Sequence, residues 1–224
     1  MAGLLASVLS FIDWSWIGAN GAMIRGDLLQ HLELSGIAIA GGLALSFPLA
    51  VLAWWHRGTR TVVLAATGLL YTIPSIALFV LIQPLTGYFS LLTAEVALVG
   101  YTLLILVRNL LTGFDQVSDE VQEAARALGY TPFEQLLRVY FPLALPSLFA
   151  GLRVATVTVI GLVTITAFVG WGGLGLLIVY GFGNNFFTTP IWVGLVLSIA
   201  LAASGDAAFV LLERVVVRWS RVRV

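Results

Sequence analysis

Cysteine and lysine are both absent from this 224-residue sequence. Without cysteine, the chain can form no disulfide framework and no cysteine metal site. Without lysine, it cannot contain the phosphate-binding loop G-x-x-x-x-G-K-[ST], so any ATPase that works with it must be another chain. The two histidines, His31 and His56, are isolated from other metal ligands, and no serine stands in a nucleophile elbow. These absences argue against an enzyme.

Charged residues are also scarce. They make up only 10% of the chain and the formal net charge is zero, which argues against a nucleic-acid-binding protein. Hydrophobic residues make up 60% and the mean hydropathy is +1.03, which is far above that of ordinary soluble domains. The composition therefore predicts an all-α integral membrane protein, folded as one polytopic transmembrane helical bundle.

Five stretches are apolar and long enough to cross a bilayer, which takes about 20 residues of helix. The expected spans are 36–55, 61–83, 89–107, 143–170 and 190–212. Pro74 interrupts the second span, and the apolar piece 176–182 is too short to cross, so we expect it to be re-entrant or interfacial. In the first span, Gly36, Ala40 and Ala44 form a stripe of small residues against which a neighbouring helix could pack.

The N-terminal residues 1–35 are expected to form an interfacial or outer segment. Their first twelve residues are too few to span and lack the basic region of a signal peptide. Asp13 and Trp14 follow, which suits a segment at the membrane interface. A sixth span is the alternative if residues 1–24 insert despite Asp13.

One polar stretch, residues 118–146, interrupts the apolar chain and reads SDEVQEAARALGYTPFEQLLRVYFPLALP. Ser118 is placed to cap a short amphipathic helix and Gly129 to end it. Thr131, with a proline after it and Glu134 three residues later, predicts a capping box that starts a second helix. Capping chemistry alone therefore predicts a surface helical hairpin between two spans.

The spacing in this stretch is more specific. Glu123-Ala124-Ala125, three residues, Gly129, nine residues and then 139–142, read VYFP, resemble the E-A-A-x3-G-x9-I-x-L-P signature of binding-protein-dependent ABC importer permeases. The two departures, Val for Ile and Phe for Leu, replace one apolar residue with another. The resemblance implies a type I importer permease fold whose coupling helix docks on a cytoplasmic ATPase subunit. The contact residues that it implies are Glu123, Ala124, Ala125, Gly129, Pro132 and Phe133.

The resemblance extends over most of the chain. The stretches LLQHLELSGIAIA, TGLLYTIPSIALF and GLRVATVTVIGLVTITAFVGWGGLG are similar to permeases for glycine betaine, carnitine and choline. This implies a quaternary-ammonium osmoprotectant as the solute, an extracytoplasmic binding protein that delivers it, and a second permease subunit, identical or different. ATP and magnesium would bind the ATPase subunits, with no cofactor in this chain. Permeases for methionine or other amino acids share the architecture and are the alternative.

Two alternatives of another class remain. An ATPase-independent channel or secondary transporter would need no coupling helix, and it is disfavoured by the complete signature and by the lack of a detectable inverted repeat. A membrane assembly protein that transports nothing would show no solute-dependent phenotype.

Arginine distribution tests the orientation without using the signature. If the polar stretch is cytoplasmic, alternating spans place nine of the eleven arginines on the same side and leave Arg25 outside and Arg153 within the fourth span. The positive-inside bias thus predicts an outer N-terminus and a cytoplasmic C-terminus in a bacterial inner membrane. Residues 36–213 would form the permease domain with a cytoplasmic loop at 115–142, and residues 214–224 a basic cytoplasmic tail.

Six residues in or beside the spans are candidates for a translocation path. They are Tyr71, Pro74, Glu95, Thr164, Thr166 and Asp206. The two ionisable groups need a cavity, an interface or a partner such as Arg153, so a polar pathway and a structural ion pair are both open. The hydroxyl groups either line a path or bond back to their own helices.

Overall fold

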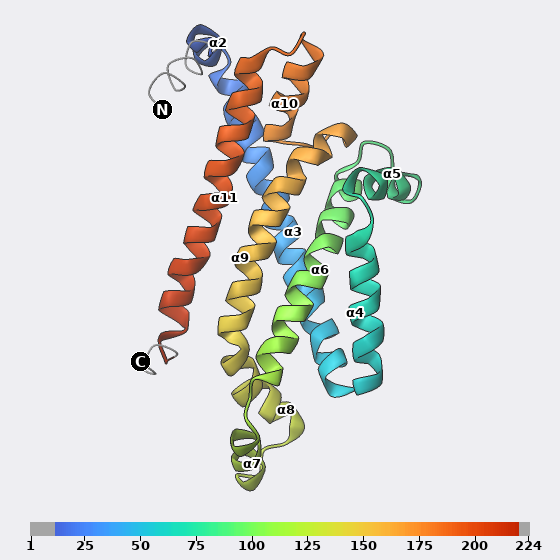
Figure 1. Ribbon diagram of the computed structural model, residues 1–224, viewed down its shortest axis with the longest axis vertical. Coiled ribbons are helices and arrows are strands. Elements are labelled where there is room, and N and C mark those ends of the chain that lie inside the picture. The colour runs from blue at the N-terminus through green and yellow to red at the C-terminus, as the bar shows by residue number, and fades with distance from the viewer. Residues whose placement is uncertain (1–11, 220–224) are drawn as a thin grey trace. The chain divides into compact units, whose positions relative to one another are not determined.

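The structure, a computed structural model, describes residues 12–219, and all regular secondary structure in that range is helical. Its elements are α2 (Trp14–Ala19), α3 (Gly21–Trp55), α4 (Arg57–Thr72), α5 (Ser75–Thr86), α6 (Leu91–Asp115), α7 (Asp119–Ala127), α8 (Pro132–Gln135), the π-helix η1 (Leu136–Tyr140), α9 (Phe141–Ile165), the 3-10 helix η2 (Thr166–Val169), α10 (Leu174–Gly183) and α11 (Thr188–Val216) (Figure 1).

Within residues 12–219, four of the five predicted spans are confirmed, and the predicted span 61–83 falls on α4 and α5, which are bent by 104° relative to each other. Four helical stretches are long and apolar enough to cross a membrane, and α4 and α5 together supply a fifth as a broken pair. The break falls at Ile73 and Pro74, and Pro74 stands at the N-cap of α5. A proline lacks the amide that would continue the helix, which explains the interruption. The short apolar helix α10 has only 10 residues, too few to cross.

One boundary differs from expectation. Helix α3 begins at Gly21, well inside the 1–35 segment that was expected to lie at the interface. Arg25, Asp27 and Glu33 make this part of α3 too polar to read as a membrane span, yet charged side chains do not prevent a helix from forming. Residues 1–11 lie outside the described range, so a sixth span there stays untested, and so does the end of the basic tail at 220–224.

The chain divides into two compact units. Unit 1 comprises Met1–Ala38, Ile73–Leu98 and Thr158–Ser204, and unit 2 comprises Ile39–Thr72, Val99–Val157 and Gly205–Val224. The boundaries fall inside α3, α6, α9 and α11, so each of these long helices contributes residues to both units.

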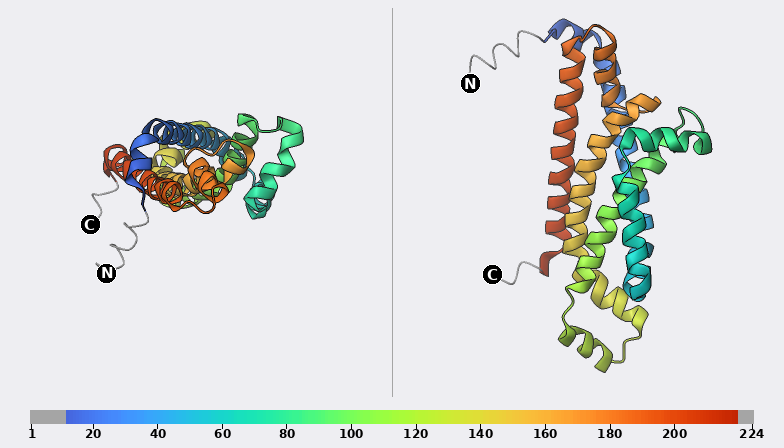
Figure 2. Two further views of the ribbon diagram at one scale, coloured as in Figure 1. Left: turned by 90° about the horizontal axis from the view of Figure 1, so that it is seen from above. Right: turned by 45° about the vertical axis from the view of Figure 1, so that its right-hand side comes forward.

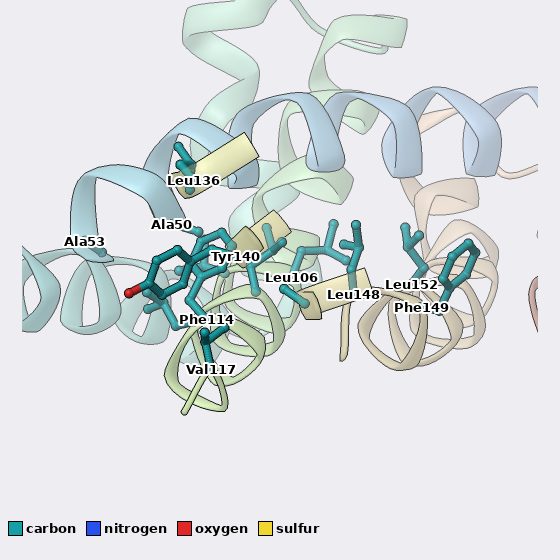
Figure 3. Packing of buried hydrophobic residues seen from close by; sticks show 14 of the residues in the cluster. Ala50, Ala53, Leu106, Phe114, Val117, Leu136, Tyr140, Leu148, Phe149 and Leu152 are labelled. Carbon is teal, nitrogen blue, oxygen red and sulfur yellow. The ribbon is translucent and has the colours of Figure 1, made fainter. Parts of the chain in front are cut away.

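Unit 2 contains a hydrophobic cluster of buried residues. Buried side chains from α3, α6, η1 and α9 meet in it, among them Leu106, Phe114, Tyr140 and Leu152 (Figure 3). Apolar contact of this kind between helices depends on close packing rather than on exclusion of water when the surroundings are lipid. The fit of small residues at the helix crossings therefore matters for stability.

Glycines mark the close crossings in unit 2. A Cβ atom at Gly42 of α3 would lie 1.8 Å from Oγ1 of Thr102 on α6, and one at Gly113 of α6 would lie 2.6 Å from Cβ of Ala144 on α9. The stripe predicted on α3 at Gly36, Ala40 and Ala44 is wrong for packing within the chain, because Gly36 has no atom within reach of an added Cβ and both alanines are exposed. The residue spacing identified a face of small residues on the helix, but it did not indicate which face of the helix packs against another helix of the chain.

Unit 1 is held by polar contacts around a glycine-rich turn. His31 of α3 is fully buried; its Nε2 donates to the carbonyl of Ile160 at 3.1 Å and its Nδ1 accepts from the amide of Leu174 at 3.3 Å. The neighbouring Gln30 accepts from the amide of Gly173 at 2.9 Å. These bonds satisfy amides at the start of α10, which in turn packs beside the first part of α11 (Figure 1).

The Gly113 crossing gives a stability prediction. A Gly113→Ala substitution places a methyl group against the backbone of Ala144, whose Cα is 2.8 Å from the new Cβ, and we expect a loss of about 1–3 kcal/mol by overpacking. Gly161→Ala, in the exposed middle of α9 with nothing within 4 Å, is the matched control and should be neutral or slightly stabilising. Thermal unfolding of both variants in detergent measures the difference, and equal melting temperatures would contradict the crossing.

Candidate functional site

The polar stretch forms the predicted helical hairpin, which lies at one end of unit 2 (Figures 1 and 2). Ser118 is the N-cap of α7 in extended conformation, but its hydroxyl makes no capping hydrogen bond to the helix amides. Instead, the Ser118 hydroxyl lies beside the carboxylate of Glu120 and holds the pKa of that group below its ordinary value. Asp119 and Glu120 both stand in the first turn, where carboxylates are favourable.

Helix α7 ends in a Schellman motif. The amide of Tyr130 donates to the carbonyl of Ala125 at 3.1 Å, and the amide of Gly129 donates to that of Arg126 at 3.0 Å. Gly129 has a φ of 77°, a conformation that a residue with a side chain adopts only at a cost. The glycine of the signature is therefore required by the backbone turn that redirects the chain into α8.

The predicted capping box at the start of α8 is confirmed. Thr131 accepts a hydrogen bond from the amide of Glu134 at 3.3 Å, and the Glu134 carboxylate accepts from the amide of Thr131 at 2.9 Å. Gln135 adds a bond to the carbonyl of Tyr130 at 2.9 Å, which closes the turn between the two helices. The turn is thus held in one shape by its own residues.

The signature residues divide into an outward and an inward set. Glu123, Ala124, Gly129 and the two α8 residues Pro132 and Phe133 are exposed, whereas Ala125 is only 4% exposed and packs against the chain. Of the implied contact residues, therefore, Ala125 supports the helix and the other five are open to a partner.

Leu128 belongs to this exposed surface, although the signature did not single it out. Its side chain is 73% exposed, and Phe133 in the next helix is 60% exposed. Both stand in the most polar segment of the chain, where large exposed apolar groups are unfavourable unless another molecule covers them. We call the exposed residues Glu123, Ala124, Leu128, Gly129, Pro132 and Phe133 the α7–α8 face.

Three aromatic rings anchor the hairpin to the long helices of unit 2. The ring of Tyr140 lies 4.5 Å from that of Trp54 and 6.4 Å from that of Phe114, and Trp54 and Phe114 are 5.7 Å apart. Trp54 and Phe114 are each one residue before the end of their helices, α3 and α6, and Tyr140 ends η1, so the cluster joins three helices where the hairpin begins and ends. Figure 3 shows Phe114 and Tyr140 next to each other, with Val117 beside them.

A π-helix connects the hairpin to α9. The turn Leu136–Tyr140 is wider than an α-helix, and Pro142, the last signature residue, follows it and lacks a backbone donor. On the opposite side, Arg60 donates twice to the carboxylate of Asp115, at 2.9 and 2.5 Å, and so fixes the end of α6 against the start of α4. Both of these side chains are more than a third exposed, so the pair contributes little stability but restricts the hairpin's exit direction.

The six candidate path residues are divided between the two units. Tyr71 and Asp206 belong to unit 2 and the other four to unit 1. Thr164 and Thr166 donate to carbonyls of their own helix, at 2.7 Å each, as the plainer alternative for a span hydroxyl predicts. Tyr71 packs its ring edge-on against Tyr101, and Pro74 stands at the break before α5. Among the described residues, no cluster of three His, Asp or Glu could hold a metal ion.

The two acidic candidates differ sharply. Asp206 of α11 pairs with Arg153 of α9 through two hydrogen bonds, from Nε at 2.7 Å and from Nη2 at 3.1 Å, so the suggested ion-pair partner is present. Glu95 of α6 is 7% exposed, and neither of its carboxylate oxygens has a hydrogen-bond partner among the described residues.

The Arg153–Asp206 pair yields a second prediction. Asp206→Asn leaves the Arg153 charge uncompensated inside a membrane span, and we expect the melting temperature in detergent to fall by about 5 °C. The double variant Arg153→Gln with Asp206→Asn removes both charges and should regain part of the loss. If the double variant is less stable than Asp206→Asn alone, the pair does not stabilise α9 against α11.

The chain matches a known protein family over residues 42–218, described as "Binding-protein-dependent transport system inner membrane component". It is 39% identical over 170 residues to the osmoprotectant import permease protein OsmW of Salmonella typhimurium, covering 74% of this chain and 79% of that protein. It is 32% identical to the glycine betaine/carnitine/choline permease protein OpuCD of Bacillus subtilis over 200 residues, or 89% of this chain and 87% of that one.

A solved structure shares the fold. The inward-facing MetNI methionine ABC transporter contains a chain with a TM-score of 0.74 and 25% identity, and the match covers 87% of this chain and 95% of that chain. The sequence relatives and the structural neighbour thus agree on the architecture and differ in the solute that their names give.

Proposed function

The chain belongs to the family of binding-protein-dependent transport system inner membrane components, as a permease subunit of an ABC importer, and we propose that its α7–α8 face receives the force of a separate ATPase subunit. The single observation that carries this proposal is the exposure of two large apolar side chains, Leu128 and Phe133, together with the charged Glu123 on one hairpin whose turn has a fixed shape. Such a surface suits a groove with an apolar floor and a polar rim.

The anchoring of the hairpin supports a role in transmitting motion. A push on α7 reaches Tyr140 through the short segment α8–η1, and Tyr140 contacts Trp54 of α3 and Phe114 of α6. Packed aromatic rings shift together rather than deform, so displacement of the hairpin moves the ends of three helices. For ATP to drive transport, the ATP-bound ATPase must bind the hairpin more tightly in one permease conformation than in the other.

The solute that fits best is a quaternary-ammonium osmoprotectant such as glycine betaine, carnitine or choline. Relatives with these solutes or osmoprotectants in their names are 29–39% identical to the chain. An amino acid such as methionine is the second candidate, favoured by the fold shared with the methionine transporter, which is 25% identical. The higher sequence identity favours the osmoprotectant.

The assembly follows from the same proposal. Two permease subunits enclose the path, a binding protein delivers solute at the outer face, and two ATPase subunits carry ATP and magnesium below the α7–α8 face. Basic residues occur in the hairpin and at the end of α11, such as Arg126 and Arg214. They support a cytoplasmic position for these two segments and hence an outer N-terminus. The lipid bilayer of a bacterial inner membrane surrounds the spans.

Two substitutions on the α7–α8 face test the docking. Glu123→Lys reverses an exposed charge, and Gly129→Asp puts a charged side chain at φ 77°. We expect each to weaken binding of the ATPase subunit about tenfold or more, because a mismatched charge in an interface costs several kcal/mol. Co-purification of the ATPase subunit and solute uptake by cells measure the loss.

The controls separate docking from folding. Gly183→Asp adds the same charge at an exposed glycine of α10 with nothing within 4 Å and should leave co-purification intact. Glu123→Gln keeps the shape of the side chain and should be milder than Glu123→Lys. Normal uptake by both Glu123→Lys and Gly129→Asp would reject the docking role, and uptake by the chain in vesicles without any ATPase subunit would reject an ATP-driven importer.

A further inference from the structure

The two units carry opposite charge. Unit 1 contains four acidic residues, Asp13, Asp27, Glu33 and Glu95, but one basic residue, Arg25, so its net charge is −3. The zero net charge of the chain therefore gives unit 2 a net charge of +3. An acidic unit attracts positively charged solutes and repels anions, before any specific contact is made.

Glu95 is the acidic group in unit 1 that is most removed from solvent. It is 7% exposed and both of its carboxylate oxygens are without hydrogen-bond partners among the described residues, while Glu33 is near enough to interact with it electrostatically. Arg25 is exposed and forms no ion pair within residues 12–219. A carboxylate in a membrane span is unfavourable without a compensating cation, which makes it a candidate for contact with a transported group.

A second unpartnered group of unit 1 is on α3. In unit 2, helices α3 and α6 run parallel, since Gly42 meets Thr102 and, further along both helices, Trp54 meets Phe114. From the same register, continued back by two turns along each helix, we infer that Ser35 is at the level of Glu95 in unit 1. The Ser35 hydroxyl is 5% exposed and also lacks a hydrogen-bond partner. Two buried polar side chains of unit 1 thus have no hydrogen-bond partner among the described residues and are open to contact with a ligand.

We propose that Glu95 is the residue of the path that recognises the positive charge of the solute, with Ser35 beside it. This inference rests on the proposed quaternary-ammonium solute. A trimethylammonium group has no N–H to donate, so it interacts through its charge, and a carboxylate that accepts no hydrogen bond from the described chain has both oxygens open to that contact. Glycine betaine also carries a carboxylate, which Glu95 repels, so choline, a simple cation, depends on Glu95 more strongly.

The test compares uptake of choline and of glycine betaine by the complete importer in proteoliposomes, with saturating loaded binding protein. In Glu95→Gln we expect the ratio of choline to glycine betaine uptake to fall about tenfold. The substitution removes the contact between the carboxylate and the positive charge of choline, and a contact of this size is expected where the two charges are partly screened. Asp27→Asn, which removes another acid of the same unit, is the matched control and should keep the ratio. Glu95→Asp keeps the charge and should therefore retain most of the wild-type uptake ratio. This variant keeps the proposal testable if Glu95→Gln assembles poorly.

The outcomes separate two failures. If the wild-type importer takes up neither compound, the proposed solute class is wrong and the role of Glu95 falls with it. If wild type takes up both and Glu95→Gln keeps the ratio, the solute class stands and the role of Glu95 is rejected. A carboxyl group that is merely protonated and buried gives this second result, because glutamine has nearly the same shape as protonated glutamate. The proposal is supported if the ratio of choline to glycine betaine uptake falls in Glu95→Gln and is kept in Glu95→Asp.

Discussion

The contact of Tyr140 with Trp54 and Phe114 is the constraint on which the function proposed for unit 2 depends. Without it, the α7–α8 hairpin would be tied to the spans only by its two chain connections and by the exposed Arg60–Asp115 pair, which contributes little stability. With it, three helices end in one packed cluster, and any force on the hairpin acts on all three together. The turn at Gly129 and the capping box at Thr131 keep the hairpin rigid, and a rigid hairpin would transmit a displacement to the helices where a flexible one would absorb it.

The two units differ in how their helices are held together and in how their polar groups are paired. In unit 2, glycines at the crossings of α3, α6 and α9 allow close approach, and the Arg153–Asp206 pair neutralises charge inside the spans. In unit 1, His31 and Gln30 satisfy amides at the start of α10. Glu95 differs from these groups, because it is a buried acidic side chain without a hydrogen-bond partner among the described residues.

Local chemistry predicted the elements well, and long-range packing was beyond it. Proline at 74, the capping box at Thr131 and the turn at Gly129 act within a few residues, so their effects follow from the sequence directly. The exposed small-residue stripe beginning at Gly36 shows the limit, since spacing gives a face but not its neighbour. The burial of His31 and the meeting of Trp54 with Tyr140 join residues far apart in the chain, and no local pattern indicates them. Leu128 could have been found as a leucine within a polar helix end.

The absence of cysteine allows the docking of the α7–α8 face to be measured directly. A single Leu128→Cys substitution introduces one reactive thiol at a side chain that is 73% exposed, and Leu85→Cys does the same at one that is 86% exposed in unit 1. After assembly with the ATPase subunit, a short thiol-to-amine cross-linker should join position 128 to the ATPase subunit and leave position 85 unjoined to it. An intact complex in which position 128 gives no cross-link to the ATPase subunit would contradict the role of α7 as the element through which ATP drives this permease.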